Sequence, residues 1–286
     1  MDPALLKLLI AASILLLVFA LGAHATFADA TSLFRDLFQP PRRLLRALVA
    51  MYVVVPAAAA GMGLAFDLAT PVRVALLAIA IAPIPPILPG KQLKVGGSSE
   101  HVFGLLVAVS VSSIVLVPVM VEILGGVFGR ESSFGPRQVA TLIGTTIFLP
   151  LAAGLLLRRL APQWAEPVAT WASRLGTVLL VAGVIVVLVA SWPAMSSLIA
   201  GGAPIAMLVL SLIAIGAGHW LGGPDPSDRS ILAIASAMRH PGVAIAVATA
   251  NVPEEPQLTA AILLYVLVAV ILTSLYVAIA KRHRRD

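Results

Sequence analysis

Arg239 and His240 are a cation and an imidazole inside an otherwise apolar stretch of this chain, where side chains that only fill a core would be apolar. They lie in the run 236–242, Ser-Ala-Met-Arg-His-Pro-Gly, and apolar residues precede and follow this run. A charged side chain inside an apolar membrane segment costs about 3 kcal/mol on insertion scales. Pro241 and Gly242 interrupt a regular helix, and backbone freed at membrane depth must be buried in protein or line a cavity. The run therefore predicts a polar site inside a membrane protein.

The composition is that of a membrane protein. The chain has 286 residues, of which 60% are hydrophobic and 11% charged, and its mean hydropathy is +1.03; soluble domains carry about 25% charged residues. The net charge of +6 comes from Lys and Arg residues in the loops and the tail. Such residues typically mark the cytoplasmic side of a membrane protein, and we favour this explanation over nucleic-acid binding. The chain has no cysteine, and its histidines show no metal-ligand spacing, so we expect no metal site. Walker loops and Gly-x-Ser-x-Gly motifs are absent as well.

Nine stretches are long and apolar enough to span a bilayer, which takes about 20 residues. This predicts an all-α polytopic membrane protein, with residues 1–286 in a single membrane domain. The predicted spans are 4–27, 44–66, 72–90, 101–127, 138–157, 170–192, 202–222, 229–251 and 257–280.

The basic residues predict the orientation of these spans. Fourteen of the nineteen Lys and Arg residues fall on one side of the predicted membrane, and Arg239 lies within a span. The opposite side holds only Lys7, Arg73, Arg130 and Arg137. Because cytoplasmic loops are enriched in Lys and Arg, we expect a multi-pass protein of the cell (inner) membrane with its N-terminus outside and its C-terminus in the cytoplasm.

Two of the predicted spans are interrupted. The third contains Pro83, Pro85 and Pro86 and then Pro89-Gly90, and the eighth breaks at Pro241-Gly242. The two spans run in opposite directions and occupy corresponding halves of the chain, which is typical of transporters built from inverted repeats with a binding site at the membrane midplane. The alternative is a pair of ordinary proline kinks.

At these positions the chain resembles the bile acid:sodium symporter superfamily. The resemblance implies a panel domain beside a core domain, with two broken helices crossing in an inverted-repeat core, and nine helices in members that lack the first. It identifies the third and eighth spans as the crossing helices. The similar residues are Phe27-Ala28-Asp29, Pro40-Pro41-Arg42-Arg43, Val55-Pro56, Pro89-Gly90, Gly96-Gly97, Ser110 to Ser113 with Pro118, and Met238 to Ala244.

The residues that would hold sodium depart from the family's pattern. In the family, small hydroxyl and amide residues follow the first Pro-Gly step, whereas Lys91-Gln92-Leu93-Lys94 follows it here. In the second crossing helix, Ala235 occupies the position where the family has a Glu, and Arg239-His240 occupies the position of the family's Gln-Asn pair. Hard cations prefer a shell of oxygen ligands. Sodium is the coupling ion that the resemblance implies, whereas these departures predict protons or no coupling ion.

We expect the substrate site where the two spans break, but several residues have a second interpretation. The planar guanidinium of Arg239 could bind a carboxylate of the substrate, or its charge could replace a missing sodium ion. Alternatively, the guanidinium donates hydrogen bonds to carbonyls freed by the break. His240 could couple transport to protons or be a neutral hydrogen-bonding partner. Lys91 could be a topology signal, and the serines could be helix-packing residues. The predicted substrate-binding residues are Arg239, His240, Pro241, Gly242, Pro89, Gly90, Lys91, Ser110 and Ser113, and the predicted ion-coupling residues are Ser236, Gln92 and Ser112.

Together these features predict a secondary active transporter of a small organic anion that works by alternating access. Its expected partners are the anionic substrate and the lipid bilayer, with no nucleic acid, no cofactor and no enzymatic activity. The identity of the substrate, the direction of transport and the oligomeric state stay open. The alternatives are a membrane-embedded enzyme and a binding or sensor protein that does not transport.

Overall fold

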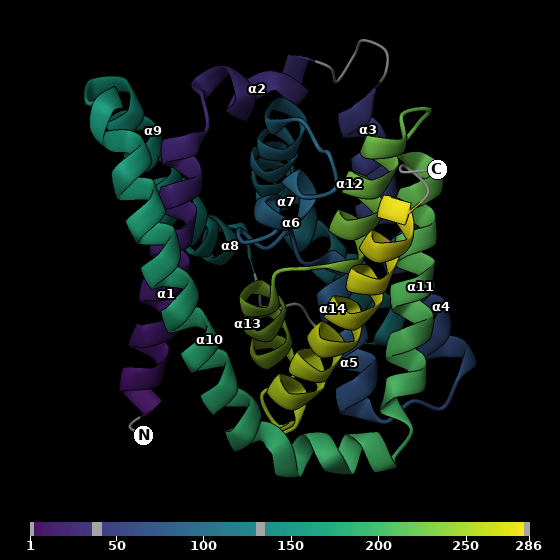
Figure 1. The fold of residues 1–286 in the computed structure, drawn as a ribbon. Helices are drawn as coiled ribbons and strands as arrows, with labels where there is room; N and C mark the ends of the chain where they lie inside the picture. Colours follow the sequence, from purple (N-terminus) through teal and green to yellow (C-terminus); the bar gives the residue numbers. More distant parts are fainter. Residues whose placement is uncertain (1–2, 36–41, 130–134, 283–286) are drawn as a thin grey trace.

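The structure, a computed structural model, describes residues 3–35, 42–129 and 135–282. Within these ranges every regular element is a helix (Figure 1), which confirms the all-α prediction. Some residues used above as signals of resemblance or orientation lie outside the described ranges. They are Pro40, Pro41 and Arg130, together with Arg284 and Arg285, which are two of the fourteen basic residues on the predicted cytoplasmic side.

The helices follow one another along the chain with short connections. The first half contains α1 (Pro3–His24), α2 (Phe27–Arg35), α3 (Arg43–Val49), the π-helix η1 (Ala50–Val54), α4 (Val55–Ala65), α5 (Thr70–Ile81), α6 (Pro89–Leu93) and α7 (Ser99–Phe128). The second half contains α8 (Pro136–Ile143), the π-helix η2 (Gly144–Phe148), α9 (Leu149–Leu160), α10 (Pro162–Ala200), α11 (Ala203–Leu221), α12 (Pro226–Ala237), α13 (Pro241–Asn251) and α14 (Leu258–Arg282).

Seven helical segments of the described residues are long and apolar enough to cross a membrane. An eighth is counted if the pair Leu8–His24 and Phe27–Leu33, which is bent by 104°, forms one span. The predicted span 72–90 is not among them, because only Thr70–Ile81 is a regular apolar helix before the prolines begin. The chain is therefore a multi-pass membrane protein, and the count of nine spans is compatible with this structure but stays a prediction.

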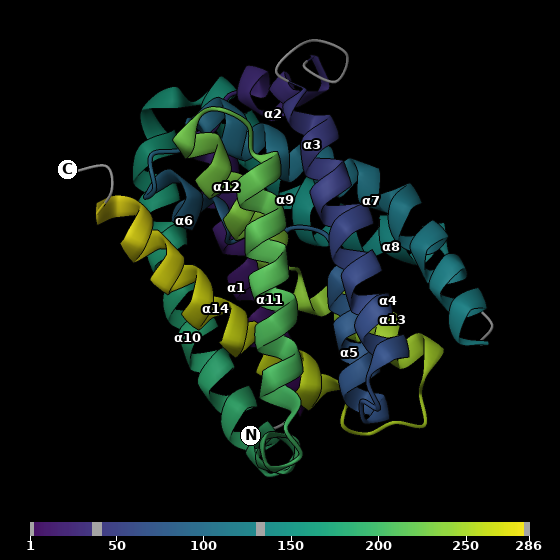
Figure 2. The same ribbon diagram turned by 90° about the vertical axis from the view of Figure 1, so that its right-hand side faces the viewer.

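The two interrupted spans run in opposite directions through the molecule. Figures 1 and 2 both place α6 and α12 in the upper half of the view and α5 and α13 in the lower half. The chain passes from α5 up to α6, and from α12 down to α13. This is the antiparallel pair that the sequence predicts, although an inverted repeat of the whole core stays a prediction.

The helices form two packing groups. One consists of α1, α9 and α10, where α1 packs along both partners at the left of Figure 1. Small residues allow this close approach: Ala20, Ala23, Ala169 and Ala172 form a separate buried cluster, and a Cβ on Gly154 would collide with the backbone of α1. The larger group contains the main hydrophobic core and both broken spans. This arrangement matches the panel and core that the resemblance implies.

The long helix α10 lies on the outside of the molecule. It extends over 39 residues and includes the predicted span 170–192. Only 11% of its most apolar window is buried, compared with 72% for the broken span Pro226–Asn251. Its interior prolines, Pro167 and Pro193, remove helical hydrogen bonds and favour bending, and its last part turns across the base of the molecule in Figure 1. The broken span is thus enclosed by protein, whereas α10 faces outward.

Candidate functional site

The two breaks lie against each other. The regular part of α5 ends at Ile81, and the gap in the eighth span lies between Ala237 and Pro241. The backbone N–H of His240 donates to the carbonyl of Pro83 at 2.8 Å. This bond joins one break directly to the other, so the predicted crossing of the third and eighth spans is present.

Arg239 is buried at this crossing, with 2% of its surface exposed. Its guanidinium donates to four backbone carbonyls, and its carbon Cζ lies 5.8 Å from the centre of the Tyr52 ring. An arginine has five N–H donors, so these bonds leave one donor on Nη1 unused. The acceptors are Met51 at 2.5 Å and Ala80, Ala82 and Ser236 at 3.0 Å each. Of the alternatives raised by the sequence, this geometry favours an arginine that bonds carbonyls freed by the breaks.

His240 uses one ring nitrogen to cap α13. Its Nδ1 accepts the backbone N–H of Val243 at 3.4 Å, so a neutral ring carries its proton on Nε2. The Nε2 atom is buried and has no hydrogen-bond partner within the described residues. A buried donor without a partner costs free energy, and a ligand oxygen at this atom would remove that cost.

Lys91 is a half-buried cation beside the second break. It lies in α6, directly after the break, and its Nζ donates to Thr273 Oγ1 at 2.7 Å and to Ser274 Oγ at 3.2 Å. The same atom lies 3.8 Å from Met238 Sδ. No ion pair among the described residues involves Lys91. Within the part of the chain that the structure describes, hydroxyl groups of α14 therefore hold this charge and no carboxylate does.

Gly90 and Gly242 are exposed, although most residues around the breaks are buried. Pro89, beside Gly90, is buried, and Pro241 is half-buried. A Cβ added to Gly90 would meet no atom within 4 Å. Backbone of both Pro-Gly steps is thus accessible at the surface of the crossing.

The remaining predicted site residues divide into bonded and unbonded groups. Gln92 is buried and donates its amide to Ile231 O at 3.0 Å, so it joins α6 to α12. Ser113 donates to Ser110 O at 2.7 Å. The hydroxyls of Ser110 and Ser236 are buried and have no hydrogen-bond partner among the described residues. Their roles in substrate binding or ion coupling, and that of the half-buried Ser112, stay predictions.

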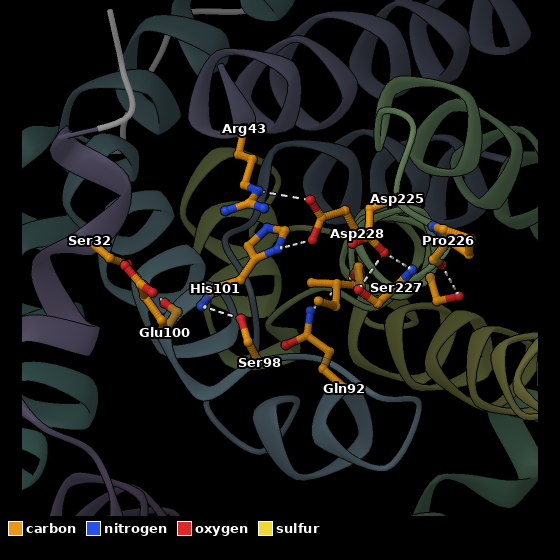
Figure 3. A network of polar contacts seen from close by, with 12 residues as sticks. Ser32, Arg43, Gln92, Ser98, Glu100, His101, Asp225, Pro226, Ser227 and Asp228 are labelled. Carbon is orange, nitrogen blue, oxygen red and sulfur yellow. Dashed lines mark hydrogen bonds and ion pairs between the residues drawn. The ribbon is translucent and has the colours of Figure 1, made fainter. Parts of the chain in front are cut away.

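A polar network that sequence reasoning did not single out joins three helices (Figure 3). Asp228, in the first turn of α12, is 6% exposed. It accepts a bond of 2.8 Å from Arg43 Nε in α3 and one of 2.6 Å from His101 Nδ1 in α7. The available signal was a carboxylate at the start of an apolar span. Just before that span, bonds from the Ser227 hydroxyl and N–H lower the pKa of Asp225, the N-cap of α12.

Two cavities reach α13 from different sides. One, of about 530 Å³, lies between α8, η2 and α13 and is lined by Arg137, Gln138, Thr141, Leu142, Thr145 and Ala246. The other, of about 170 Å³, lies between α5, α7 and α13 and is mostly apolar, with Arg73 at its wall. Neither is lined by Arg239, His240 or Lys91. The structure therefore brings Arg239, His240 and Lys91 to the crossing but places none of them in either of these two cavities.

Comparison with known proteins identifies one family. A family model described as the Sodium Bile acid symporter family matches residues 11–200, which is 190 of the 286 residues. The match includes the first broken span and ends before the second. A search of curated proteins finds no match to the chain.

Proposed function

The chain belongs to the sodium bile acid symporter family, and we propose that it carries a small organic anion across the cell membrane by alternating access, with the anion bound at the crossing of the two broken spans. Members of this family are transporters. The observation that carries the location is the direct bond between the breaks, from His240 N–H to Pro83 O. This bond joins the two spans into one structural unit. The accessible backbone of the Pro-Gly steps and the polar side chains of Arg239, His240 and Lys91 lie beside it.

Lys91 is the cation best suited to hold the anion. Arg239 has one of its five N–H donors left after its four carbonyl bonds, whereas the ammonium of Lys91 has only neutral oxygen and sulfur neighbours. Exchanging a neutral hydroxyl acceptor for a carboxylate adds the attraction between opposite charges to a hydrogen bond that the ammonium already makes. Lys91 is also half-exposed and follows the accessible Gly90. We therefore assign substrate charge recognition to Lys91.

The two packing groups supply the moving parts of the mechanism. The group α1, α9 and α10 would move against the larger group, which contains both breaks. The cavity of about 530 Å³ borders α13, so it could admit a small molecule toward the second break. Arg137 and two threonines on its wall could attract an anion and bond it before it reaches the crossing.

Uptake by purified protein in proteoliposomes tests this function. The candidate substrates to be tested are short carboxylates, aromatic carboxylates and sulfonates. If the protein is a transporter, uptake should saturate as the substrate concentration rises, and the protein should show counterflow. Lys91→Gln should lower uptake about tenfold or more, because a hydrogen bond to a charged group contributes about 1.5–3 kcal/mol. Lys94→Gln is the matched control, since Lys94 is exposed on the same segment.

Three results would contradict the proposal. Equal uptake by the Lys91 and Lys94 variants would remove Lys91 from the site. Specific binding of an anion without any flux would identify a sensor. Conversion of the anion to a product, in detergent and without vesicles, would identify a membrane-embedded enzyme.

A further inference from the structure

Backbone carbonyls from three elements converge on the guanidinium of Arg239. They belong to Met51 in η1, to Ala80 and Ala82 at the end of α5, and to Ser236 in α12, and the four bonds are 2.5–3.0 Å long. Carbonyl oxygens are the ligands that proteins use to replace the hydration shell of a monovalent cation. Four of them directed at one buried charge form a cation site whose occupant belongs to the chain.

Each carbonyl is available for a reason that can be traced to local structure. The last carbonyls of a helix have no partner within it, which explains Ala80 and Ala82 near the end of α5 and Ser236 near the end of α12. Met51 is different, because it lies in a π-helix where Val55 N–H donates to Ala50 O. The next donor would be Pro56, which has no N–H. The site therefore exists because of two helix breaks and one proline.

Among the described residues, no carboxylate pairs with the charge of Arg239. The ion pairs of the described residues do not include it, and its carbon Cζ lies 5.8 Å from the centre of the Tyr52 ring, which carries no formal charge. A second cation at the same oxygens would face a like charge in a dry environment, where repulsion is strong. The residues present at this position therefore do not fit a sodium ion.

We propose that Arg239 is a built-in cation that fills the carbonyl site between the two breaks, so that the protein binds no sodium there and transports its anion without requiring sodium. The inference deepens the proposed transport function and rests on it. It predicts that removal of the side chain creates a vacant site selective for small cations.

Thermal stability of the purified protein tests the site without any need for transport. The melting temperature of the wild type should be the same in sodium chloride and in choline chloride. Arg239→Ala should melt well below the wild type, and guanidinium at low millimolar concentration, or sodium, should restore part of the loss, whereas choline should not. Arg73→Ala is the matched control, because the guanidinium carbon of Arg73 also lies 5.8 Å from the centre of an aromatic ring, that of Phe128, whereas no carbonyl of the described residues accepts a hydrogen bond from its side chain. Its melting temperature should not respond to guanidinium.

Several outcomes would overturn the inference. Sodium-dependent stabilisation of the wild type would show that sodium binds despite Arg239. A folded Arg239→Ala protein that responds to no cation, or to guanidinium no more than Arg73→Ala, would show that the carbonyls need no charge. If Arg239→Ala does not fold, Arg239→Lys keeps the charge and should remain indifferent to sodium, and a sodium response in that variant or in the wild type would refute the proposal.

Uptake separates this inference from the proposed function. Equal anion uptake in sodium and choline supports both. Uptake that depends steeply on sodium overturns the built-in cation and leaves transport intact. Absence of any uptake overturns the transport function, while the melting experiments still decide what occupies the carbonyl site.

Discussion

Replacement of Asp228 by alanine should destabilise the protein more than any other single loss of a carboxylate among the described residues. Asp228 is the buried acceptor of the network in Figure 3, and it joins α12, one half of the second broken span, to α3 and α7. Its two bonds, from Arg43 at 2.8 Å and from His101 at 2.6 Å, would both be lost. The substitution therefore removes the polar tie between three helices of the larger packing group.

The expected loss of stability in Asp228→Ala follows from the solvent exposure of Arg43 and His101, the two partners of Asp228. Removal of one member of a buried ion pair costs about 3–5 kcal/mol. The Arg43 side chain is 34% exposed and can turn to water, whereas that of His101 is 5% exposed and cannot. Discounting for the hydrated partner gives about 2–4 kcal/mol. At about 2–4 °C for each kcal/mol in chains of this size, the melting temperature should fall by about 4–16 °C.

Melting of the purified protein in detergent measures this effect. Asp67→Ala is the matched control, because Asp67 is exposed in a loop and surface substitutions change stability by about 0.5 kcal/mol or less. Asp228→Asn should lose less than Asp228→Ala, since its amide oxygen still accepts one bond. If Asp228→Ala melts within error of Asp67→Ala, the network does not stabilise the fold and the reasoning is refuted.

Two further substitutions test helix contacts. Gly154→Ala should lower the melting temperature, because its Cβ would collide with the carbonyl of Phe19 and overpacking costs about 1–3 kcal/mol. Gly126→Ala is the control and should have little effect, since a Cβ there meets nothing within 4 Å. Equal melting of the two variants would contradict the close packing of α1 on α9. Gln92→Leu should also lower the melting temperature, because it removes the side-chain bond from the Gln92 amide to the carbonyl of Ile231 in α12, which contributes about 0.5–1.5 kcal/mol. Unchanged melting would show that α6 does not depend on this bond.

The sequence alone determined the class of the protein and the positions of both breaks. Long apolar stretches must form helices in a bilayer, because every backbone group needs an internal partner there. Prolines end helices wherever they occur, since they lack an N–H and clash with the preceding turn. For this reason the interruption after Ile81 and the one before Pro241 could be predicted from local rules. A charge within an apolar span likewise predicted a buried polar site at Arg239.

Only the tertiary structure decided which groups those residues meet. The acceptors of Arg239 in η1, in α5 and directly after α5 lie 157 to 188 positions away along the chain. The partners of Asp228 lie 127 and 185 positions away. Sequence could propose a substrate carboxylate, a replaced sodium ion or freed carbonyls for Arg239, because a guanidinium satisfies each of them. The choice depends on which helix ends pack together, and that is determined by the packing of the whole molecule and not by any short run of residues.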